Sequence, residues 1–198
     1  MSPCRHVLDA PLPAVHDGGK IQEDKMPHAV HAATAETFAA MLGTLSGILA
    51  KAAVRADAAG LLDARLAPDM FPLAIQVQLV CFHADNGVKR LMGREAAAFS
   101  AVQEAGFAVL QSLISTTRDN LAKLTPENFA GAGERHIVLP LQPPNVLEAD
   151  GTHFMNFWLL PNFYFHLVTA YDILRANGLD IGKKDFMAHT SGFRRELA

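Results

Sequence analysis

Apolar residues recur at three- and four-residue steps along most of this chain, and this period constrains the fold more than any other feature. Such spacing places the side chains on one face of an α-helix, over about four turns in the first case. Four segments carry a stripe of this kind. The clearest consists of Phe38, Met41, Leu42, Leu45, Ile48, Leu49 and Ala52. Four amphipathic helices predict a mainly all-α protein, a four-helix bundle.

Glycine and proline mark where these helices should begin and end. We expect the first helix to stop at Gly60, because glycine often follows the last turn of a helix. The second should begin near Pro72, since proline is tolerated in a first turn, and end at Gly93. The third is expected over residues 96–123, with Phe99, Val102, Val109, Leu110, Leu113 and Leu121 facing inward. The last is expected over residues 152–176.

The helical period is interrupted once, before the last helix. Residues 136–139 alternate like a strand, the prolines at 143–144 exclude a helix, and residues 145–147 can form the return strand. A short β-hairpin is therefore predicted. Pro161 lies within the last helix and should kink it or separate its first turns.

The length of 198 residues suits one domain with tails. Residues 1–27 show prolines, a glycine pair and no apolar period, which predicts a disordered N-terminal tail. The bundle is expected over residues 28–187, followed by a C-terminal tail over 188–198. In the last twenty residues, Phe186 and Phe193 are candidate anchors.

Charge and composition exclude several classes of partner. A net charge of −3 gives no basic field for nucleic acid. The basic cluster of Lys89, Arg90 and Arg94 is interpreted as a solvated helix end, where cations complement the dipole. Residues 151–171 lack charged side chains but contain several polar ones, so we expect a core helix and no membrane span.

The N-terminus and the cysteines favour the cytoplasm. The first residues lack the continuous apolar run of a signal peptide, and Met26 is an alternative start of the protein. Cys4 and Cys81 lie in different sequence contexts, so a disulfide is not expected. Cys81 falls on an apolar helix face, where burial raises the pKa of a thiol and makes it a poor nucleophile.

Two histidines on separate helices are the strongest candidates for a functional site. Gln76 and His83 are seven residues apart and share one stripe of the second helix, whereas Asn162 and His166 share a face of the last. One interpretation is that His83 and His166 meet across the bundle and bind a divalent zinc, nickel or iron ion. Asn162, Gln76 or water would complete the ligand sphere.

A second interpretation involves no metal. His83 and His166 are then core residues that bond to neighbouring carbonyls, amides or Asp85, as most buried polar groups do. The remaining histidines fit a metal site less well. His153 points away from His166 on a regular helix, and His136 is expected to face solvent. The other candidates match no standard ligand spacing: Cys4, His6, His16, His28 and His31.

Two stretches carry a family resemblance, LAPDMFPLAIQVQLVCFHADNGVKRL and LPNFYFHLVTAYDILRANGLDIGKKDF. They resemble an uncharacterised bacterial and fungal family, a domain of unknown function that is similar to the DinB/YfiT-like metalloenzyme superfamily. The resemblance covers residues 28–187. It implies a DinB/YfiT-like four-helix bundle with a short β-hairpin before the last helix, often found as a dimer.

The resemblance also implies a metal site and a type of reaction. Many superfamily members bind a divalent metal through three histidines, one on the second helix and two spaced i, i+4 on the last. His83 corresponds to the second-helix ligand and His166 to the later member of the pair. Asn162 stands at the earlier position, and a neutral amide binds transition metals more weakly than imidazole. Some members are thiol-dependent transferases or isomerases.

Three hypotheses about function follow, and whether the protein is an enzyme stays open. The first is a small-molecule-handling protein whose metal acts as a Lewis acid on a thiol or carbonyl substrate. Its pocket would be lined by Gln76, His83, Asn162, His166 and Tyr164. The second is a non-catalytic binding or dimerisation module with a metal-free site. The third is a cofactor-free enzyme that uses His166 as a general base.

Overall fold

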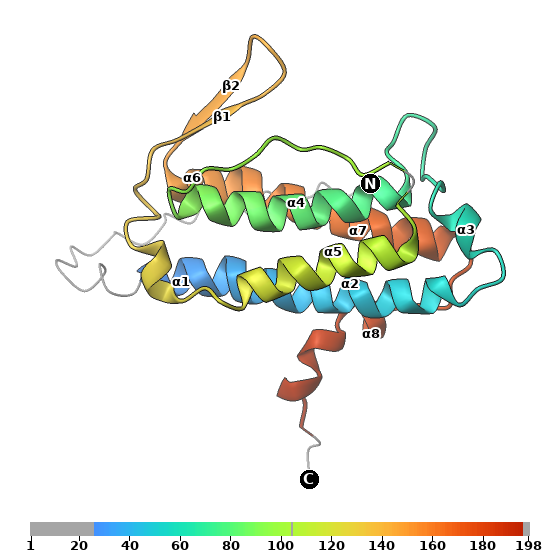
Figure 1. Cartoon of the computed structure of the whole chain (residues 1–198). Coiled ribbons are helices and arrows are strands. Elements are labelled where there is room, and N and C mark those ends of the chain that lie inside the picture. Colours follow the sequence, from blue (N-terminus) through green and yellow to red (C-terminus); the bar gives the residue numbers. More distant parts are fainter. Residues whose placement is uncertain (1–25, 104, 196–198) are drawn as a thin grey trace, which may run out of the picture.

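The computed structural model describes residues 26–103 and 105–195 and shows a four-helix bundle with a protruding β-hairpin (Figure 1). In chain order its elements are α1 (Met26–His31), the π-helical turn η1 (Ala32–Glu36), α2 (Thr37–Ala53), α3 (Ala58–Leu61), α4 (Leu73–Leu91), α5 (Phe107–Leu121), the 3₁₀ turn η2 (Pro126–Phe129), β1 (Ile137–Pro140), β2 (Val146–Ala149), α6 (Gly151–Phe154), the π-helical turn η3 (Met155–Leu159), α7 (Leu160–Ala176), α8 (Lys183–Phe186) and the 3₁₀ turn η4 (Ala188–Phe193). The predicted fold class is confirmed.

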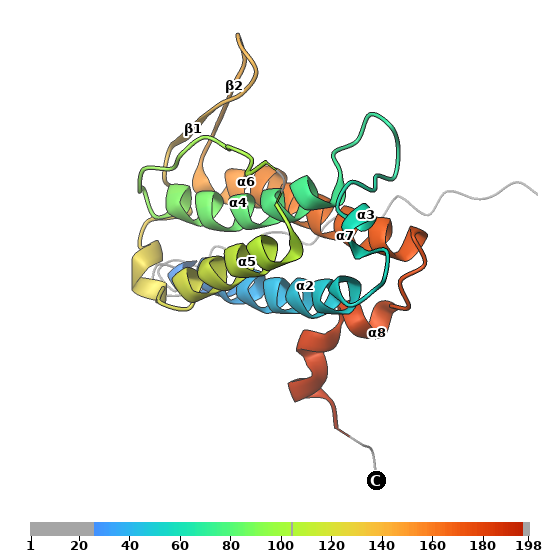
Figure 2. The same ribbon diagram turned by 45° about the vertical axis from the view of Figure 1, so that its right-hand side comes forward.

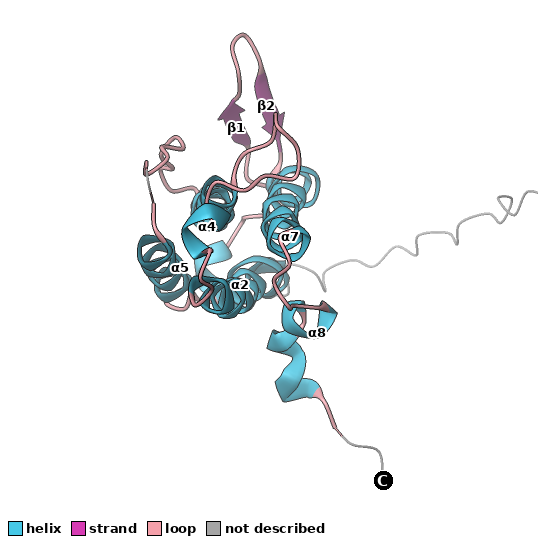
Figure 3. Ribbon diagram, turned by 90° about the vertical axis from the view of Figure 1, so that its right-hand side faces the viewer, coloured by secondary structure: helices cyan, strands magenta, loops and turns pink. Residues whose placement is uncertain are grey.

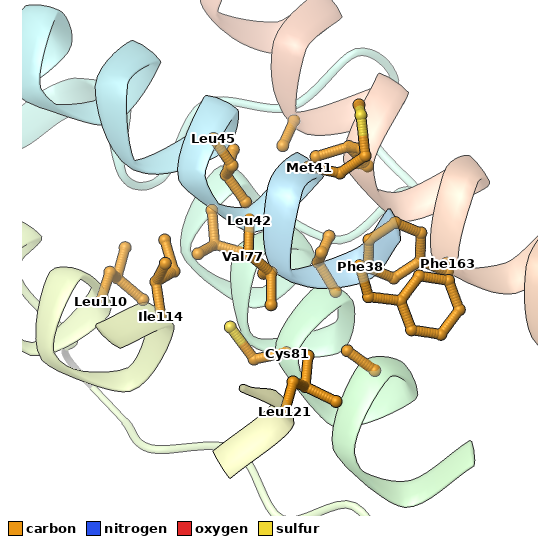
Figure 4. Close-up of a cluster of buried hydrophobic side chains, with 14 of the residues drawn as sticks. Phe38, Met41, Leu42, Leu45, Val77, Cys81, Leu110, Ile114, Leu121 and Phe163 are labelled. Atoms are coloured by element: carbon orange, nitrogen blue, oxygen red, sulfur yellow. The ribbon is translucent and has the colours of Figure 1, made fainter. Parts of the chain in front are cut away.

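The four long helices enclose one apolar core. Viewed end-on, α2, α5, α4 and α7 occupy the corners of the bundle, and α4 packs most extensively against α7 (Figure 3). Phe38 of α2 stacks on Phe163 of α7 with ring centroids 4.1 Å apart. Leu42, Val77 and Ile114 fill the centre of the same cluster (Figure 4). These are residues of the apolar stripes, so burial of the stripes drives assembly of the bundle.

The first helical run, Met26–Ala53, is long and apolar enough to cross a membrane by length and composition alone. Its apolar stripe is buried within the bundle, as in any core helix. The helix ends at Ala53, before the predicted stop, and Gly60 lies inside the short helix α3. The apolar stripe ends at Ala52, and Val54 is 85% exposed, so nothing in the core holds a further turn.

The third helix begins at Phe107, so the prediction of a helix from residue 96 was wrong. Residues 92–103 and 105–106, here called the crossover segment, run back along α4 without regular structure (Figure 1). Gln78 donates to the Val102 carbonyl and accepts from the Val102 amide, at 3.1 and 2.7 Å, while Asn86 donates to the Ala97 carbonyl. These side chains replace the backbone partners that a helix would have supplied.

The geometry of the bundle explains why this segment is extended. α5 runs parallel to α4, so the chain must return the length of α4, which is 19 residues or about 28 Å. Residues 96–106 would span only about 16 Å as a helix but reach about 36 Å when extended. The inward direction predicted for Val102 and Val109 was also wrong, since they are 51% and 46% exposed.

The predicted hairpin is present and projects from one end of the bundle (Figures 1 and 2). β1 and β2 pair antiparallel, with Ile137 opposite Ala149. Ile137 faces the core and is buried. His136 is exposed, as predicted, and pairs with Glu148 at 2.7 Å.

Pro161 lies within a helical run that continues from residue 151 to residue 176. It occupies the first turn of α7, and the predicted kink stays a prediction. The preceding turn, η3, is π-helical. A π turn holds more residues than an α turn, and this brings Phe154 and Leu159, five residues apart, onto the same buried face.

The C-terminal segment leaves the bundle beside α2 (Figure 2). Phe186 packs edge-on against Tyr171, with ring centroids 5.6 Å apart, and Asp185 pairs with Lys51 at 2.6 Å. Phe193 is 86% exposed, so the prediction that it anchors this segment was wrong. Within the predicted N-terminal tail, residues 1–25 lie outside the described part of the chain.

Candidate functional site

A polar stripe follows one side of α4 within an otherwise apolar helix. Its members are Gln76, His83, Asn86 and Arg90, separated by seven, three and four residues. This spacing keeps them on one face over four turns. The crossover segment, α7 and the start of the hairpin all lie against this side of the helix. The stripe therefore places polar side chains at the edge of the apolar core.

His83 and His166 meet across the contact between α4 and α7. Their ring centroids are 5.3 Å apart and the ring planes differ by 10°. α4 and α7 run antiparallel, so the middle of one helix meets the middle of the other. The sequence interpretation that placed these two imidazoles together is matched by this geometry, and their role as metal ligands stays a prediction.

Gln76 fixes the tautomer of His166. The Gln76 amide nitrogen donates to the Phe71 carbonyl at 3.1 Å, which directs its oxygen toward Nδ1 of His166 at 2.7 Å. Because that oxygen only accepts, Nδ1 must carry the proton. In the neutral ring Nε2 then keeps its lone pair, which is the arrangement found in metal-binding histidines held by a polar neighbour.

Burial lowers the pKa of His166 to about 4, and burial together with the proximity of His166 lowers the pKa of His83 to about 4. Both imidazoles are therefore neutral at pH 7. Neutral imidazole is the form that binds metals. A general base works best with a pKa near the operating pH, so the third hypothesis, a base at His166, is disfavoured.

The neutral pair predicts a loss of stability in acid. Unfolded histidines have a pKa near 6.5, above the folded value, so between about pH 6.5 and 4 the unfolded state binds more protons. We expect the free energy of unfolding to fall by an order of 1–3 kcal/mol across this window. Urea titrations with chelator present measure it. In a His83→Gln, His166→Gln double variant this part of the pH dependence should disappear; an unchanged slope would contradict the assignment.

Of the other residues predicted for the site, Asn162 lies near His166, whereas Tyr164 and Asp85 do not join the histidine pair. Asn162 lies one turn before His166, and its amide nitrogen donates to the Trp158 carbonyl at 2.7 Å, so the oxygen Oδ1 is the atom that could act as a metal ligand. Tyr164 lies about 200° around α7 from His166 and packs against the ring of Phe163. Tyr164 therefore does not join the pair. Asp85 pairs with Lys89 at 2.6 Å and not with either histidine.

A pocket of about 380 Å³ opens beside His83. α4, the crossover segment, the hairpin and η3 form its walls. The aromatic lining residues are Phe82, Phe99, Phe154 and Trp158. Of the five residues predicted to line a pocket, His83 alone does so here. The volume is within the range of small-molecule sites.

The sequence analysis missed Asn86 and Arg90, which line this pocket. Their signal was the spacing of three and then four residues from His83. The interpretation of Arg90 as a solvated cation was wrong, because its guanidinium is partly buried against Asn86 and the hairpin. Burial lowers its pKa.

The remaining candidate ligands lie elsewhere or are inert. No group of three or more histidine, cysteine or carboxylate side chains with metal-site geometry occurs in residues 26–103 and 105–195. Asp150 caps the start of α6 by accepting from the His153 amide at 2.8 Å, and the His153 ring pairs with the same carboxylate; His31 bonds to the Leu124 carbonyl at 3.0 Å. Cys81 is buried, which raises the pKa of its thiol to about 12. Cys4, His6 and His16 lie outside the described residues.

Comparison with known proteins supports the same fold. The sequence profile of a family described as a domain of unknown function (DUF1993) matches residues 30–187. A crystal structure of a DinB family member protein from Shewanella denitrificans is 35% identical, with a TM-score of 0.74; the match covers 81% of this chain and 93% of that one. A comparison with curated proteins finds no match. The chain thus belongs to the DUF1993 family of domains of unknown function and has a DinB-like fold.

Proposed function

We propose that this protein handles a small molecule in the pocket beside His83, with one divalent zinc, nickel or iron ion held by His83 and His166. The observation that carries the proposal is the stacked pair of imidazoles, of which His83 lines that pocket and His166 has its tautomer fixed by Gln76. Transferase or isomerase chemistry on a thiol or carbonyl substrate is the reaction class that the resemblance favours.

The donor set fits a weak, open metal site. Two imidazole nitrogens and the Asn162 amide oxygen are the available protein ligands, since the Asn162 nitrogen is committed to Trp158. Catalytic zinc sites keep three protein ligands and an open position, whereas an amide is a poor third ligand for a transition metal. When bound, the metal supplies Lewis acidity toward a thiol or carbonyl group.

The residues of the chain itself position and desolvate the site. Gln76 holds the His166 ring in one orientation, through a bond whose other end is the Phe71 carbonyl. Apolar side chains of α4 and α7 keep both imidazoles neutral. Trp158 and Phe99 close the sides of the pocket, which limits access of water to a bound molecule.

Titration with Co²⁺, which reports its ligands by visible absorption, tests the metal site in tag-free protein. We expect one cobalt per chain, displaced by Zn²⁺, and loss of binding in His83→Ala and in His166→Ala. Gln76→Leu keeps both imidazoles but removes the orienting oxygen, and we expect it to weaken binding about 10–100-fold. Elemental analysis of protein purified without chelator measures the metal carried from the cell.

Two exposed histidines provide matched controls. His136→Ala and His153→Ala remove exposed imidazoles whose ion-pair partners among the described residues are Glu148 and Asp150. Both variants should bind cobalt as the wild type does. Cobalt binding that survives loss of both His83 and His166, or that follows the control positions, would refute the site.

A metal-free binding or dimerisation module is the second candidate. The absence of a third strong ligand among the described residues favours it. In that case His83→Ala and His166→Ala would lower stability but leave a negligible metal content unchanged. A homodimer and a cytoplasmic location stay predictions from the sequence.

A further inference from the structure

Arg90 stands out in the pocket because no carboxylate of the described residues pairs with it. Its Nε donates to Asn86 Oδ1 at 2.9 Å, and Nη1 makes a long contact of 3.5 Å with the Val138 carbonyl. The other N–H groups, including both on Nη2, have no acceptor within residues 26–103 and 105–195. No ion pair of the described residues includes Arg90.

Partial burial removes some of the water that solvates the Arg90 guanidinium, so an anion bound there interacts with it more strongly than in open solvent. Burial lowers the pKa of Arg90, and no charged group of the described residues offsets that effect. Asn86 holds the guanidinium on one side and is itself tied to the Ala97 carbonyl of the crossover segment. Arg90 is therefore held in position before a ligand binds, and its N–H groups that have no acceptor among the described residues are available to a ligand in the pocket that it lines.

The rest of the pocket is apolar and aromatic. Phe82, Phe99 and Trp158 supply ring surfaces, and Leu139 and Leu141 of the hairpin region complete the wall. Arg90 is the one lysine, arginine or carboxylate side chain among the lining residues. A single positive charge in such surroundings selects a monoanion. A planar guanidinium edge matches a carboxylate, with two parallel N–H···O bonds.

We infer that the pocket binds an organic monocarboxylate with a flat apolar body, its carboxylate on Arg90 and its body extending toward His83. Seven residues separate Arg90 from His83, which is about 10 Å along the helix axis. A ligand of that length places its far end at the imidazole pair. The inference deepens the proposed function by naming the ligand class, but carboxylate binding at Arg90 does not require the metal.

3-Phenylpropionate is a probe of suitable length, and its neutral counterpart is 3-phenylpropionamide. Trp158 is the single tryptophan of the chain and lines the pocket, so its fluorescence reports binding directly. We expect the acid to bind the wild type at least about tenfold more tightly than the amide, as for other charge-assisted pairs. In Arg90→Met this preference should vanish, whereas Arg94→Met, an exposed neighbour outside this pocket, should retain it.

Arg90→Lys keeps the positive charge but lacks the planar guanidinium edge. It provides a second test if Arg90→Met does not fold. We expect a reduced but surviving preference for the acid, with an unchanged circular dichroism spectrum. Equal binding of acid and amide, binding of neither at millimolar concentration, or a preference that persists in Arg90→Met overturns the inference.

Repeating the titration with chelator separates this inference from the metal site. Acid binding that depends on Arg90 and persists without metal supports the inference, even if cobalt binding fails. Acid binding that requires metal and His166 but not Arg90 overturns it, because the carboxylate would then be a metal ligand.

Discussion

Replacing Asn162 by histidine is expected to tighten Co²⁺ and Zn²⁺ binding by more than about tenfold. Position 162 lies one turn before His166 on α7, on the face that meets His83. Its amide is a weak ligand, and an imidazole there would give the three-histidine set that the family resemblance implies. Competition with a chromophoric chelator measures the change in affinity.

Val168→His is the matched control, because it adds an imidazole to the same helix on a side that is 40% exposed. It should leave the affinity of the pair unchanged. If Asn162→His binds no more tightly than the wild type while remaining folded, then His83 and His166 do not form a metal site.

Gly151→Ala is expected to destabilise the protein by about 2–3 kcal/mol, the usual effect of overpacking a rigid site. A Cβ on Gly151 would overlap the carbonyl oxygen of Ala132. That carbonyl belongs to a loop held against the start of α6 by Gly133, which accepts from the Thr152 amide at 2.9 Å. Backbone cannot move aside as a flexible side chain can. Thermal unfolding should show a Tm about 5–10 °C lower.

Gly47→Ala provides the control within the same fold. Gly47 lies in α2, and an added Cβ would meet nothing within 4 Å. Alanine favours helix over glycine by about 0.5–1 kcal/mol, so this variant should be as stable as the wild type or slightly more so. A similar loss of stability in both variants would contradict the steric explanation for Gly151.

Local periodicity was sufficient to predict the helices that supply the core. Phe38, Leu42 and Phe163 are buried where their spacing indicates, and Pro72 and Gly93 mark the ends of α4. These features depend on neighbours three or four residues away, and such neighbours are visible in the sequence. The hairpin was predictable for the same reason, since its strands alternate and its turn contains two prolines.

The crossover segment was not predictable from local pattern. Residues 96–106 contain good helix formers, and propensity favours a helix there. Extension follows from the parallel course of α4 and α5, and from Gln78 and Asn86, whose side-chain amides take the place of helical backbone partners. Tertiary packing overrides a preference of a few tenths of a kcal/mol per residue.

The amino-acid pattern was sufficient to predict the bundle, the buried stripes and the two histidines that could face one another. Their surroundings depend on the folded chain: the Gln76 bond to His166, an Arg90 that no carboxylate of the described residues pairs with, and a pocket closed by segments far apart in the chain. The difference is one of range along the chain. Helical periodicity arises between near neighbours, whereas the pocket arises where the hairpin and the crossover segment return to α4, and no local pattern records that return.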